Sequence, residues 1–264
     1  MKILPVHSPE NLEVFRNLRK QWPDQLKRGF FYAEGEQVFA RLLESQLEIL
    51  SVLLTPELFE LHGRELENKS CSVAITEKSW IESTTMQKLN QGILALARIP
   101  KPFELFSLQG QARFCIVALD GLDHAVNVGT IFRTCAAFGV NAVITTSVHP
   151  YSWRVVRASL GGVFKVPYIM SEDLFETLKF LKNLGTTLIA ADPSSQSLLS
   201  EKKIPEKICL ILGNEHKGIS SKVLSLNPER VTIPMSGKMD SLNVAAASAI
   251  FLYELSLLGN CNHR

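Results

Sequence analysis

The sequence of 264 residues lacks the residue clusters that identify a metalloprotein or a disulfide-stabilised scaffold. Its five cysteines form no CxxC pair, and its six histidines show no HxH or HxxxH spacing. Zinc sites and disulfide frameworks are recognised by such close spacings, so neither is expected here. We therefore predict a protein without a bound metal.

Long apolar runs are also absent. No uncharged apolar stretch reaches the ~18 residues that a membrane span requires, because Glu254 interrupts the last apolar segment. The first eleven residues contain no apolar core behind their lysine, which argues against a signal peptide. These absences favour a cytoplasmic protein with no membrane partner. A hydrophobic content of 46% predicts a globular protein, and the length is comfortable for two domains.

The usual nucleotide-binding motifs are missing. No GxGxxG follows a predicted strand, so a dinucleotide site is not supported. Gly213 and Gly218 have the spacing of a phosphate loop, but Ile219-Ser220 follow where an NTPase needs Lys and then Ser or Thr. The net charge of +2 is too small to indicate nucleic-acid binding by itself. A nucleic-acid partner would have to be held by local basic patches.

The first part of the chain alternates between predicted strands and helices. Strands are expected at 29–33, 49–54, 71–75 and 92–98, and helices at 37–44, from 55 onward, at 77–82 and from Ser8. This alternation predicts a small α/β domain. Pro100-Lys101-Pro102 breaks regular structure and marks a linker. We therefore expect one domain over residues 1–105 and a second over residues 106–264.

The second part also reads as α/β. Strands are expected at 114–119, 142–144, 166–169, 188–191, 208–212 and 231–233, with helices at 127–138, 152–160, 174–184 and 244–258. The continuous apolar run 114–119 is typical of a strand buried on both faces, which favours a mostly parallel sheet. Ligands of such sheets bind at the carboxyl ends of the strands. Three loops qualify, those after Leu119, Leu212 and Ile233.

The last of these loops leads into an Ala-rich segment. Ser241 or Asn243 can cap the helix that begins at Val244. That helix is apolar nearly all round, which predicts that it is buried rather than surface-lying. By itself the stretch fits two interpretations. It is either an ordinary capped core helix or a loop that holds a small polar ligand at a helix N-terminus.

Arg133 lies off the core stripe of the helix at 127–138. The apolar residues of that helix recur at a period of 3.6, and Arg133 points away from them beside the small residues Thr130 and Ala137. It is either a solvated surface arginine or an arginine presented to a ligand, with small neighbours that leave room for a bulky group.

Three stretches together resemble a known family. Asn127-Val-Gly-Thr-Ile-Phe-Arg133-Thr, Gly213-Asn-Glu215-x-x-Gly218, and Ile233-Pro-Met with Ser241-Leu-Asn243 resemble the motifs of the SpoU (TrmH-type) RNA 2′-O-ribose methyltransferases of the SPOUT superfamily. The resemblance covers about residues 114–258. Residues 31–36 and 90–95 are similar to that family's optional substrate domain, a small α/β unit akin to certain ribosomal proteins. Members with this domain tend to modify ribosomal RNA.

The resemblance implies S-adenosylmethionine as cofactor, a deep trefoil knot in the C-terminal part, and a homodimer. The residues expected to bind the cofactor, largely through backbone groups, are Gly213, Ile233, Leu242, Leu212, Ala191 and Met235. The residues expected at the catalytic and substrate positions are Arg133, Asn127, Glu215, Ser241 and Asn243.

The implied reaction is an SN2 transfer of a methyl group from a sulfonium to a ribose 2′-oxygen, with loss of the hydroxyl proton. Two roles stay open for Arg133. Either the site perturbs it enough to act as a base, or it grips a phosphate and stabilises negative charge while water takes the proton. A guanidinium with a pKa above ~12 favours the second role.

Basic residues outside the three motifs are candidates for RNA contacts. Arg154, Arg157 and Lys165 flank the Gly161-Gly162 turn and could hold phosphates. A second basic group precedes the aromatic stretch at 30–32, namely Arg16, Arg19, Lys20, Lys27 and Arg28.

Other functions stay open on the sequence alone. The same chemistry could act on transfer RNA rather than ribosomal RNA. A base or a protein could be the methyl acceptor, although the Asn127 and Arg133 pair fits the ribose-directed branch. The chain could also be a non-catalytic RNA-binding assembly factor on the same scaffold.

Overall fold

The computed structural model describes residues 2–4, 15, 26–84, 91–202 and 205–258. The chain forms two compact units, one of Met1–Lys101 with Tyr151–Phe164 and one of Pro102–Pro150 with Lys165–Arg264. The segment Tyr151–Phe164 therefore belongs to the first unit, although it lies within the second half of the sequence. The helix expected from Ser8 falls outside the described residues.

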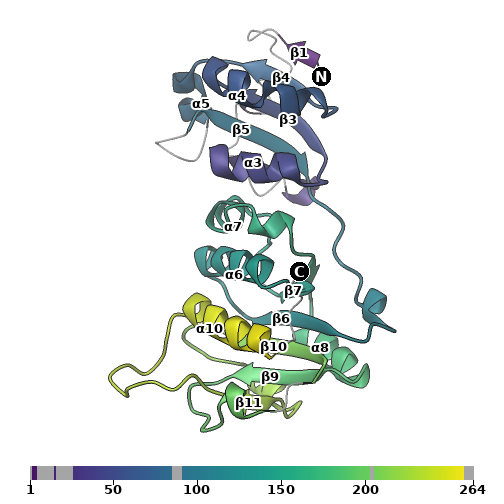
Figure 1. Cartoon of the computed structure of the whole chain (residues 1–264), viewed down its shortest axis with the longest axis vertical. Helices are drawn as coiled ribbons and strands as arrows, with labels where there is room; N and C mark the ends of the chain where they lie inside the picture. Colours follow the sequence, from purple (N-terminus) through teal and green to yellow (C-terminus); the bar gives the residue numbers. More distant parts are fainter. Residues whose placement is uncertain (1, 5–14, 16–25, 85–90, 203–204, 259–264) are drawn as a thin grey trace. The chain divides into compact units, whose positions relative to one another are not determined.

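The first unit is built on a five-stranded mixed sheet with the order β1-β4-β3-β5-β2 (Figure 1). Its strands are β1 (Lys2–Leu4), β2 (Phe30–Glu34), β3 (Ile49–Leu54), β4 (Ser72–Ile75) and β5 (Ile93–Arg98). Its helices are α3 (Glu36–Glu44), α4 (Pro56–Glu67), α5 (Lys78–Thr84) and α7 (Trp153–Ala158), followed by a 3-10 turn at Gly162–Phe164. The sheet pairs β5 antiparallel to β2 and β3, and the other pairs are parallel.

Aromatic packing joins α7 and its 3-10 turn to β2 within this unit. The Phe31 ring lies 4.8 Å from the Tyr151 ring and 5.5 Å from the Phe164 ring, centroid to centroid. Gly161, with φ +81°, has no room for a side chain, since a Cβ there would lie 2.5 Å from Cβ of Arg41 on α3. The glycine therefore lets the turn after α7 approach α3 closely.

The second unit holds a six-stranded, fully parallel sheet with the order β11-β9-β10-β6-β7-β8. Its strands are β6 (Phe114–Asp120), β7 (Ala142–Thr145), β8 (Tyr168–Met170), β9 (Thr187–Ala191), β10 (Lys207–Gly213) and β11 (Glu229–Val231). Its helices are α6 (Ala125–Ala137), α8 (Leu174–Asn183), α9 (Ser221–Leu224) and α10 (Val244–Leu257), with 3-10 turns at Leu105–Leu108 and Leu199–Glu201. The expected α/β fold with a parallel sheet is confirmed.

Helices cover both faces of this sheet. Leu174, Leu178 and Leu181 of α8 pack with alternate strand residues, including Ile116 and Ile211, in one buried cluster. On the other face α6 and α10 lie against each other (Figure 1). Covering both faces explains the continuous apolar sequences of the central strands β6 and β10.

Two expectations about the end of the chain were wrong. The last strand ends at Val231 rather than Ile233, because Val231 is the last residue aligned with β9 and Thr232 donates its backbone N–H to Ser197 instead. The last helix is not buried all round. Ile250, Tyr253 and Leu257 are 37%, 54% and 67% exposed, because α6 and the sheet cover only one side of α10.

Among the described residues, no helix combines the length and the apolar character needed to cross a membrane.

Candidate functional site

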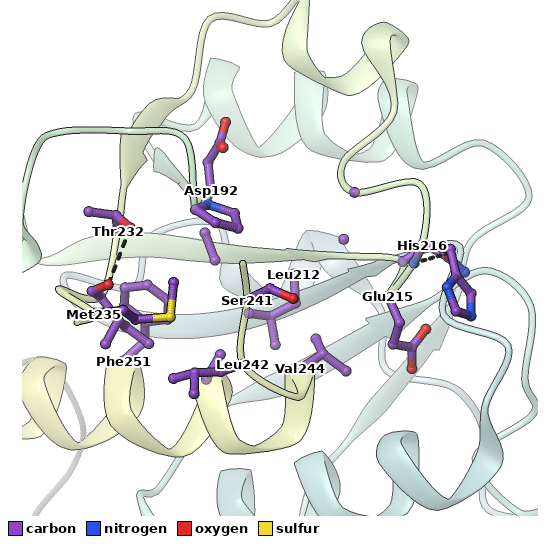
Figure 2. Close-up of a pocket in the computed structure, with 17 residues that line it drawn as sticks. Asp192, Leu212, Glu215, His216, Thr232, Met235, Ser241, Leu242, Val244 and Phe251 are labelled. Atoms are coloured by element: carbon purple, nitrogen blue, oxygen red, sulfur yellow. Dashed lines mark hydrogen bonds between the residues drawn. The ribbon is translucent and has the colours of Figure 1, made fainter. Parts of the chain in front are cut away.

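A cavity of about 270 Å³ lies at the carboxyl ends of β9, β10 and β11, beside the start of α10 (Figure 2). Three loops and one helix supply its walls. The cavity is lined by Ala191, Asp192, Pro193, Leu212, Gly213, Asn214, Glu215, His216, Gly218, Thr232, Ile233, Met235, Ser241, Leu242, Val244, Ala247 and Phe251. All six residues that the sequence suggests for cofactor binding, and two of the five suggested catalytic residues, Glu215 and Ser241, line this one cavity.

The cavity differs from one end to the other. Met235 and Phe251 lie near one end, while Glu215 and His216 lie at the other, with Leu212, Ser241 and Leu242 between them (Figure 2). Asp192 lies along a third side. An elongated site with an apolar end and a polar end suits a ligand that carries an aromatic ring at one end and a charged group at the other.

The loop after β10 is held in one conformation by its own backbone. Asn214 N–H donates to the Gly218 carbonyl at 3.0 Å, and Gly218 N–H donates back to the Asn214 carbonyl at 2.9 Å. A Cβ on Gly213 would lie 2.4 Å from the Gly218 carbonyl carbon and from the Ile219 nitrogen. Because real Cβ atoms do not approach so closely, only glycine fits at Gly213.

The side chain of Asn214 ties this loop to the loop after β6. Its Nδ2 donates to the Gly121 carbonyl at 2.8 Å, and its Oδ1 accepts from the backbone N–H of His216 at 3.0 Å. Asp120, at the end of β6, accepts from Ser220 N–H at 2.7 Å. These bonds fix the direction in which Glu215 and His216 leave the sheet.

A hydrogen-bonded chain links the three sequence motifs. Asn127 Nδ2 donates to Glu215 Oε1 at 2.6 Å, and Asn243 Nδ2 donates to Asn127 Oδ1 at 3.1 Å. Asn243 Oδ1 in turn accepts from the backbone N–H groups of Ala245 and Ala246, at 2.9 and 3.3 Å. Of the two cap candidates that the sequence offers, Ser241 and Asn243, Asn243 is the N-cap of α10, and it is also the last member of a relay to Glu215.

Asp192 is the second carboxylate of the cavity, and it is already paired. It accepts from Arg230 Nε at 2.5 Å and from Ser194 N–H and Oγ–H at 2.9 and 2.8 Å. Burial alone would raise the pKa of Asp192, but the bonds from Ser194 and Arg230 outweigh it and hold that pKa below its ordinary value. Asp192 therefore stays ionised and in place near neutral pH.

Arg133 does not line the cavity of its own chain. It is exposed on α6, on the same helical face as Val126 and Ala137, which are also exposed. Within the part of the chain that the structure describes, Arg133 has no hydrogen-bond or ion-pair partner. The structure brings Asn127, Glu215 and Asn243 together and leaves Arg133 outside their network.

The three suggested RNA-binding residues are all exposed, and none of them lines this cavity. Arg154 and Arg157 are on α7 in the first unit, where Cζ of Arg154 lies 5.3 Å from the centroid of the Trp153 ring. Lys165 belongs to the second unit and is the first residue after the segment Tyr151–Phe164. Of the other basic group, Lys27 and Arg28 are described, and Arg16, Arg19 and Lys20 lie outside the described residues.

Sequence reasoning named Ala191 at the end of β9 but missed Asp192, the next residue of the same wall. Asp192 follows β9, yet only the loops after Leu119, Leu212 and Ile233 were expected to form the site. The signal was present, because Asp192-Pro193 directly follows a predicted strand at its carboxyl end. The loop after Leu119 contributes indirectly, through Asn127 in the first turn of α6.

The sequence of the chain is similar to those of known proteins. Residues 115–253 match the model of the SpoU rRNA Methylase family. An uncharacterized tRNA/rRNA methyltransferase of Mycobacterium tuberculosis is 32% identical to this chain over 94% of it and 89% of the relative. The 23S rRNA (guanosine-2′-O-)-methyltransferase of Photorhabdus laumondii is 26% identical, over 75% of this chain and 88% of that protein.

Solved structures are similar over nearly the whole length. A putative RNA methyltransferase of the TrmH family from Porphyromonas gingivalis has a TM-score of 0.78 at 29% identity, with 94% of this chain and 97% of that chain covered. An AdoMet-bound rRNA methyltransferase from Sinorhizobium meliloti has a TM-score of 0.80 at 24% identity, with 96% and 97% covered. The second similarity shows a shared fold.

Proposed function

Since the chain belongs to the SpoU rRNA methylase family, we propose that it transfers a methyl group from S-adenosyl-L-methionine to a ribose 2′-hydroxyl of RNA. The observation that carries this proposal is the convergence of Glu215, Asn127 and Asn243 beside a cavity at the strand ends. Ribosomal RNA is the proposed substrate, supported by the name of the Photorhabdus relative and by the two-unit organisation of this chain.

The cavity fits the cofactor by size and by the chemistry of its lining. Its volume of about 270 Å³ is close to the ~300 Å³ at the lower end of small-molecule pockets. Leu242, Met235 and Phe251 offer apolar surface to a flat, uncharged adenine, and the backbone at Gly213 and Ile233 offers donors and acceptors.

When bound, S-adenosyl-L-methionine supplies an electrophilic methyl group, so that an O–CH₃ bond forms at the ribose as the S–CH₃ bond breaks. The chain's own residues align the acceptor. Glu215, held by Asn127, accepts a hydrogen bond from a ribose hydroxyl and fixes its direction. Ser241 lines the cavity between its two ends. The proton leaves to water, and Arg133 stabilises nearby negative charge, because a guanidinium holds its proton too tightly to be a base.

We propose that the protein is a homodimer and that Arg133 acts in the partner's site. Val126, Ile250, Tyr253 and Leu257 expose apolar surface on α6 and α10, and the Phe138 ring lies 6.4 Å from the Tyr253 ring. An exposed apolar patch on two adjacent helices is typical of an interface. Arg133 lies on this same face of α6 and away from its own cavity, so a two-fold interface would deliver it to the partner.

The trefoil knot and the cytoplasmic location are part of this proposal. Motif order and the fold shared with the SpoU structures support the knot. An enzyme of ribosomal RNA would meet its substrate in the cytoplasm.

Two measurements test the activity. Calorimetry should show binding of S-adenosyl-L-methionine to the wild-type protein, and the Glu215→Ala variant should still bind it. Mapping of 2′-O-methyl groups should then find one ribosomal RNA position that is methylated only in cells with the wild-type gene. An absence of cofactor binding would instead support a non-catalytic assembly factor. A methyl group found on transfer RNA rather than on ribosomal RNA would make transfer RNA the substrate.

A mixing experiment tests the shared site. Arg133→Ala and Glu215→Ala homodimers should each be inactive. After the two variants are mixed and their subunits exchanged, the mixture should recover about a quarter of wild-type activity, because about half of its dimers are mixed and each of these has one intact site of two. If each site were built from one chain, mixing would restore nothing. Arg133→Lys should be far less active than wild type, and near-normal turnover would exclude any role that needs the planar guanidinium.

A further inference from the structure

His216 lines the large cavity at its polar end, and the proposed function gives its side chain no role. Figure 2 shows the imidazole at the same end of the cavity as the Glu215 carboxylate. The backbone N–H of His216 donates to Asn214 Oδ1 at 3.0 Å, within the loop that the Asn214 and Gly218 backbones close on each other. The imidazole is therefore carried by a loop whose conformation is held.

The side chains of Glu215 and His216 keep capacity for a ligand. In the part of the chain that the structure describes, the His216 imidazole has no hydrogen-bond or ion-pair partner, and the residue is exposed. Asn127 Nδ2 donates to Glu215 Oε1 at 2.6 Å, while Glu215 Oε2 has no partner among these same residues. The polar end thus offers one carboxylate oxygen and one imidazole that can exchange a proton with a bound substrate.

The proposed methyl transfer releases a proton that a group of the site must accept. The ribose hydroxyl donates to Glu215 in the aligned state, and it becomes far more acidic as the O–CH₃ bond forms, so the proton moves first along that hydrogen bond. A carboxyl group ordinarily releases its proton near pH ~4, whereas an imidazolium ordinarily does so near pH ~6.5. A protonated carboxyl group therefore gives its proton to an imidazole within reach.

The composition of the cavity singles out His216 as that imidazole. Among the described lining residues, the other ionisable groups are Glu215 and Asp192, both carboxylic acids. The Asp192 carboxylate is already paired with Ser194 and Arg230. Histidine is the residue type whose charge ordinarily changes between pH 5 and 8, which suits a group that takes up a proton and releases it in each turnover.

We propose that His216 receives the ribose proton from Glu215 and releases it to water, an inference that rests on the proposed methyl transfer. The ribose O–H bond breaks as the O–CH₃ bond forms, and the proton binds Glu215. It then passes, directly or through one water, to a nitrogen of the neutral imidazole, which becomes an imidazolium. Because His216 is exposed, the imidazolium returns the proton to solvent and Glu215 is again a carboxylate.

Single-turnover methyl transfer at saturating S-adenosyl-L-methionine tests this relay, with ribosomal RNA from cells that lack the protein. His216→Ala should lower the rate by at least about 100-fold, the lower end of what a positioned acid or base contributes. Added imidazole should restore this rate severalfold, in proportion to the concentration of neutral imidazole. His216→Gln keeps a polar side chain but cannot take up a proton, so it should be as slow as His216→Ala.

The matched control is His124→Ala. His124 is also exposed, makes no side-chain cap bond to α6 and does not line the cavity. This variant should keep the wild-type rate, with or without imidazole. A second measurement needs neither cofactor nor turnover. Diethyl pyrocarbonate, which modifies neutral imidazoles, should modify His216 in the free protein, and the same ribosomal RNA should protect it, as followed by mass spectrometry.

Three results would overturn the inference. They are a wild-type rate in His216→Ala or in His216→Gln, a slow His216→Ala that imidazole does not rescue, and modification of His216 that the RNA leaves unchanged. A wild-type protein that transfers no methyl group would refute the proposed function and the relay together. An active wild type with an equally active His216→Ala variant would refute the relay alone.

Discussion

The relay from Asn243 through Asn127 to Glu215 predicts that two asparagines outside the cavity control the rate of methyl transfer. The bond from Asn127 Nδ2 to Glu215 Oε1 is 2.6 Å long, which is typical of a hydrogen bond to a charged group. Such bonds are worth about 1.5–3 kcal/mol. If Glu215 must be held to align the ribose, Asn127→Ala should lower kcat by about 10- to 150-fold, at one factor of ten per ~1.4 kcal/mol.

Asn243 separates this catalytic effect from a structural one. Asn243→Ala removes the cap of α10 as well as the relay, so it should cost about 0.5–2 kcal/mol of stability besides activity. Asn243→Asp keeps an acceptor for Ala245 N–H and Ala246 N–H, and a negative charge is favourable at a helix N-terminus. It cannot donate to Asn127, so its kcat should fall about 2- to 12-fold, the worth of one neutral hydrogen bond, with Tm maintained.

The assay is single-turnover methyl transfer to ribosomal RNA from cells that lack this protein, with thermal unfolding of each variant alongside. Neither Asn127 nor Asn243 lines the cavity, so the Kd for S-adenosyl-L-methionine should stay within about twofold, a free-energy change well under ~1 kcal/mol. The reasoning fails if Asn127→Ala keeps wild-type kcat, or if its whole defect appears as weaker cofactor binding. It fails equally if Asn243→Asp is as active as the wild type.

Three further outcomes follow from the structure. Gly213→Ala should abolish cofactor binding and cost about 1–3 kcal/mol of stability, because its Cβ would overlap Gly218. The control is Gly63→Ala in α4, where a Cβ meets only the Phe59 ring at 3.6 Å. This control variant should keep wild-type cofactor binding and stability in the same calorimetry and melting experiments. Asp192→Asn should destabilise the protein by up to about 1 kcal/mol at pH 7, since Arg230 is half exposed. The lowered pKa of Asp192 means that its contribution is present above the unfolded-state value of ~4 and is lost as the pH falls through the folded value, so urea unfolding at pH 3 should show a smaller difference. Ile250→Glu with Tyr253→Lys should turn the proposed dimer into a monomer in sedimentation experiments, and an unchanged dimer would place the interface elsewhere.

The elements of the fold were predictable because each one carries its own periodic signal. The apolar run of β6 and the cap of α10 are local features, and both were located to within a residue or two. The end of β11 was misplaced, since apolar Ile233 continues the strand pattern while the chain has already left β9 for Ser197. The membership of α7 in the first unit was equally invisible, because it depends on the distant contact of Phe31 with Tyr151.

The lining of the cavity was predictable from the sequence, but the hydrogen bonds that connect its loops were not. All six expected cofactor residues line it, since family motifs mark the strand ends. No spacing rule could show that Asn127 donates to Glu215, which lies 88 positions away in the sequence. Nor could one show that Asn243 donates to Asn127, which lies 116 positions away. Asp192 was overlooked because its residue type is common in loops and its partner Arg230 lies 38 positions away in the sequence.

Asn243 lies between the cavity proposed for the cofactor and the hydrogen-bonded relay proposed to hold Glu215. The residues on either side of it, Leu242 and Val244, line the cofactor cavity, while its own side chain faces Asn127 and the first turn of α10. Leu242 and Val244 therefore line the cavity from either side of Asn243, while neither asparagine of the relay lines it. The two roles of this stretch are therefore separable, since a change at Asn243 removes the cap and the relay without removing a lining side chain.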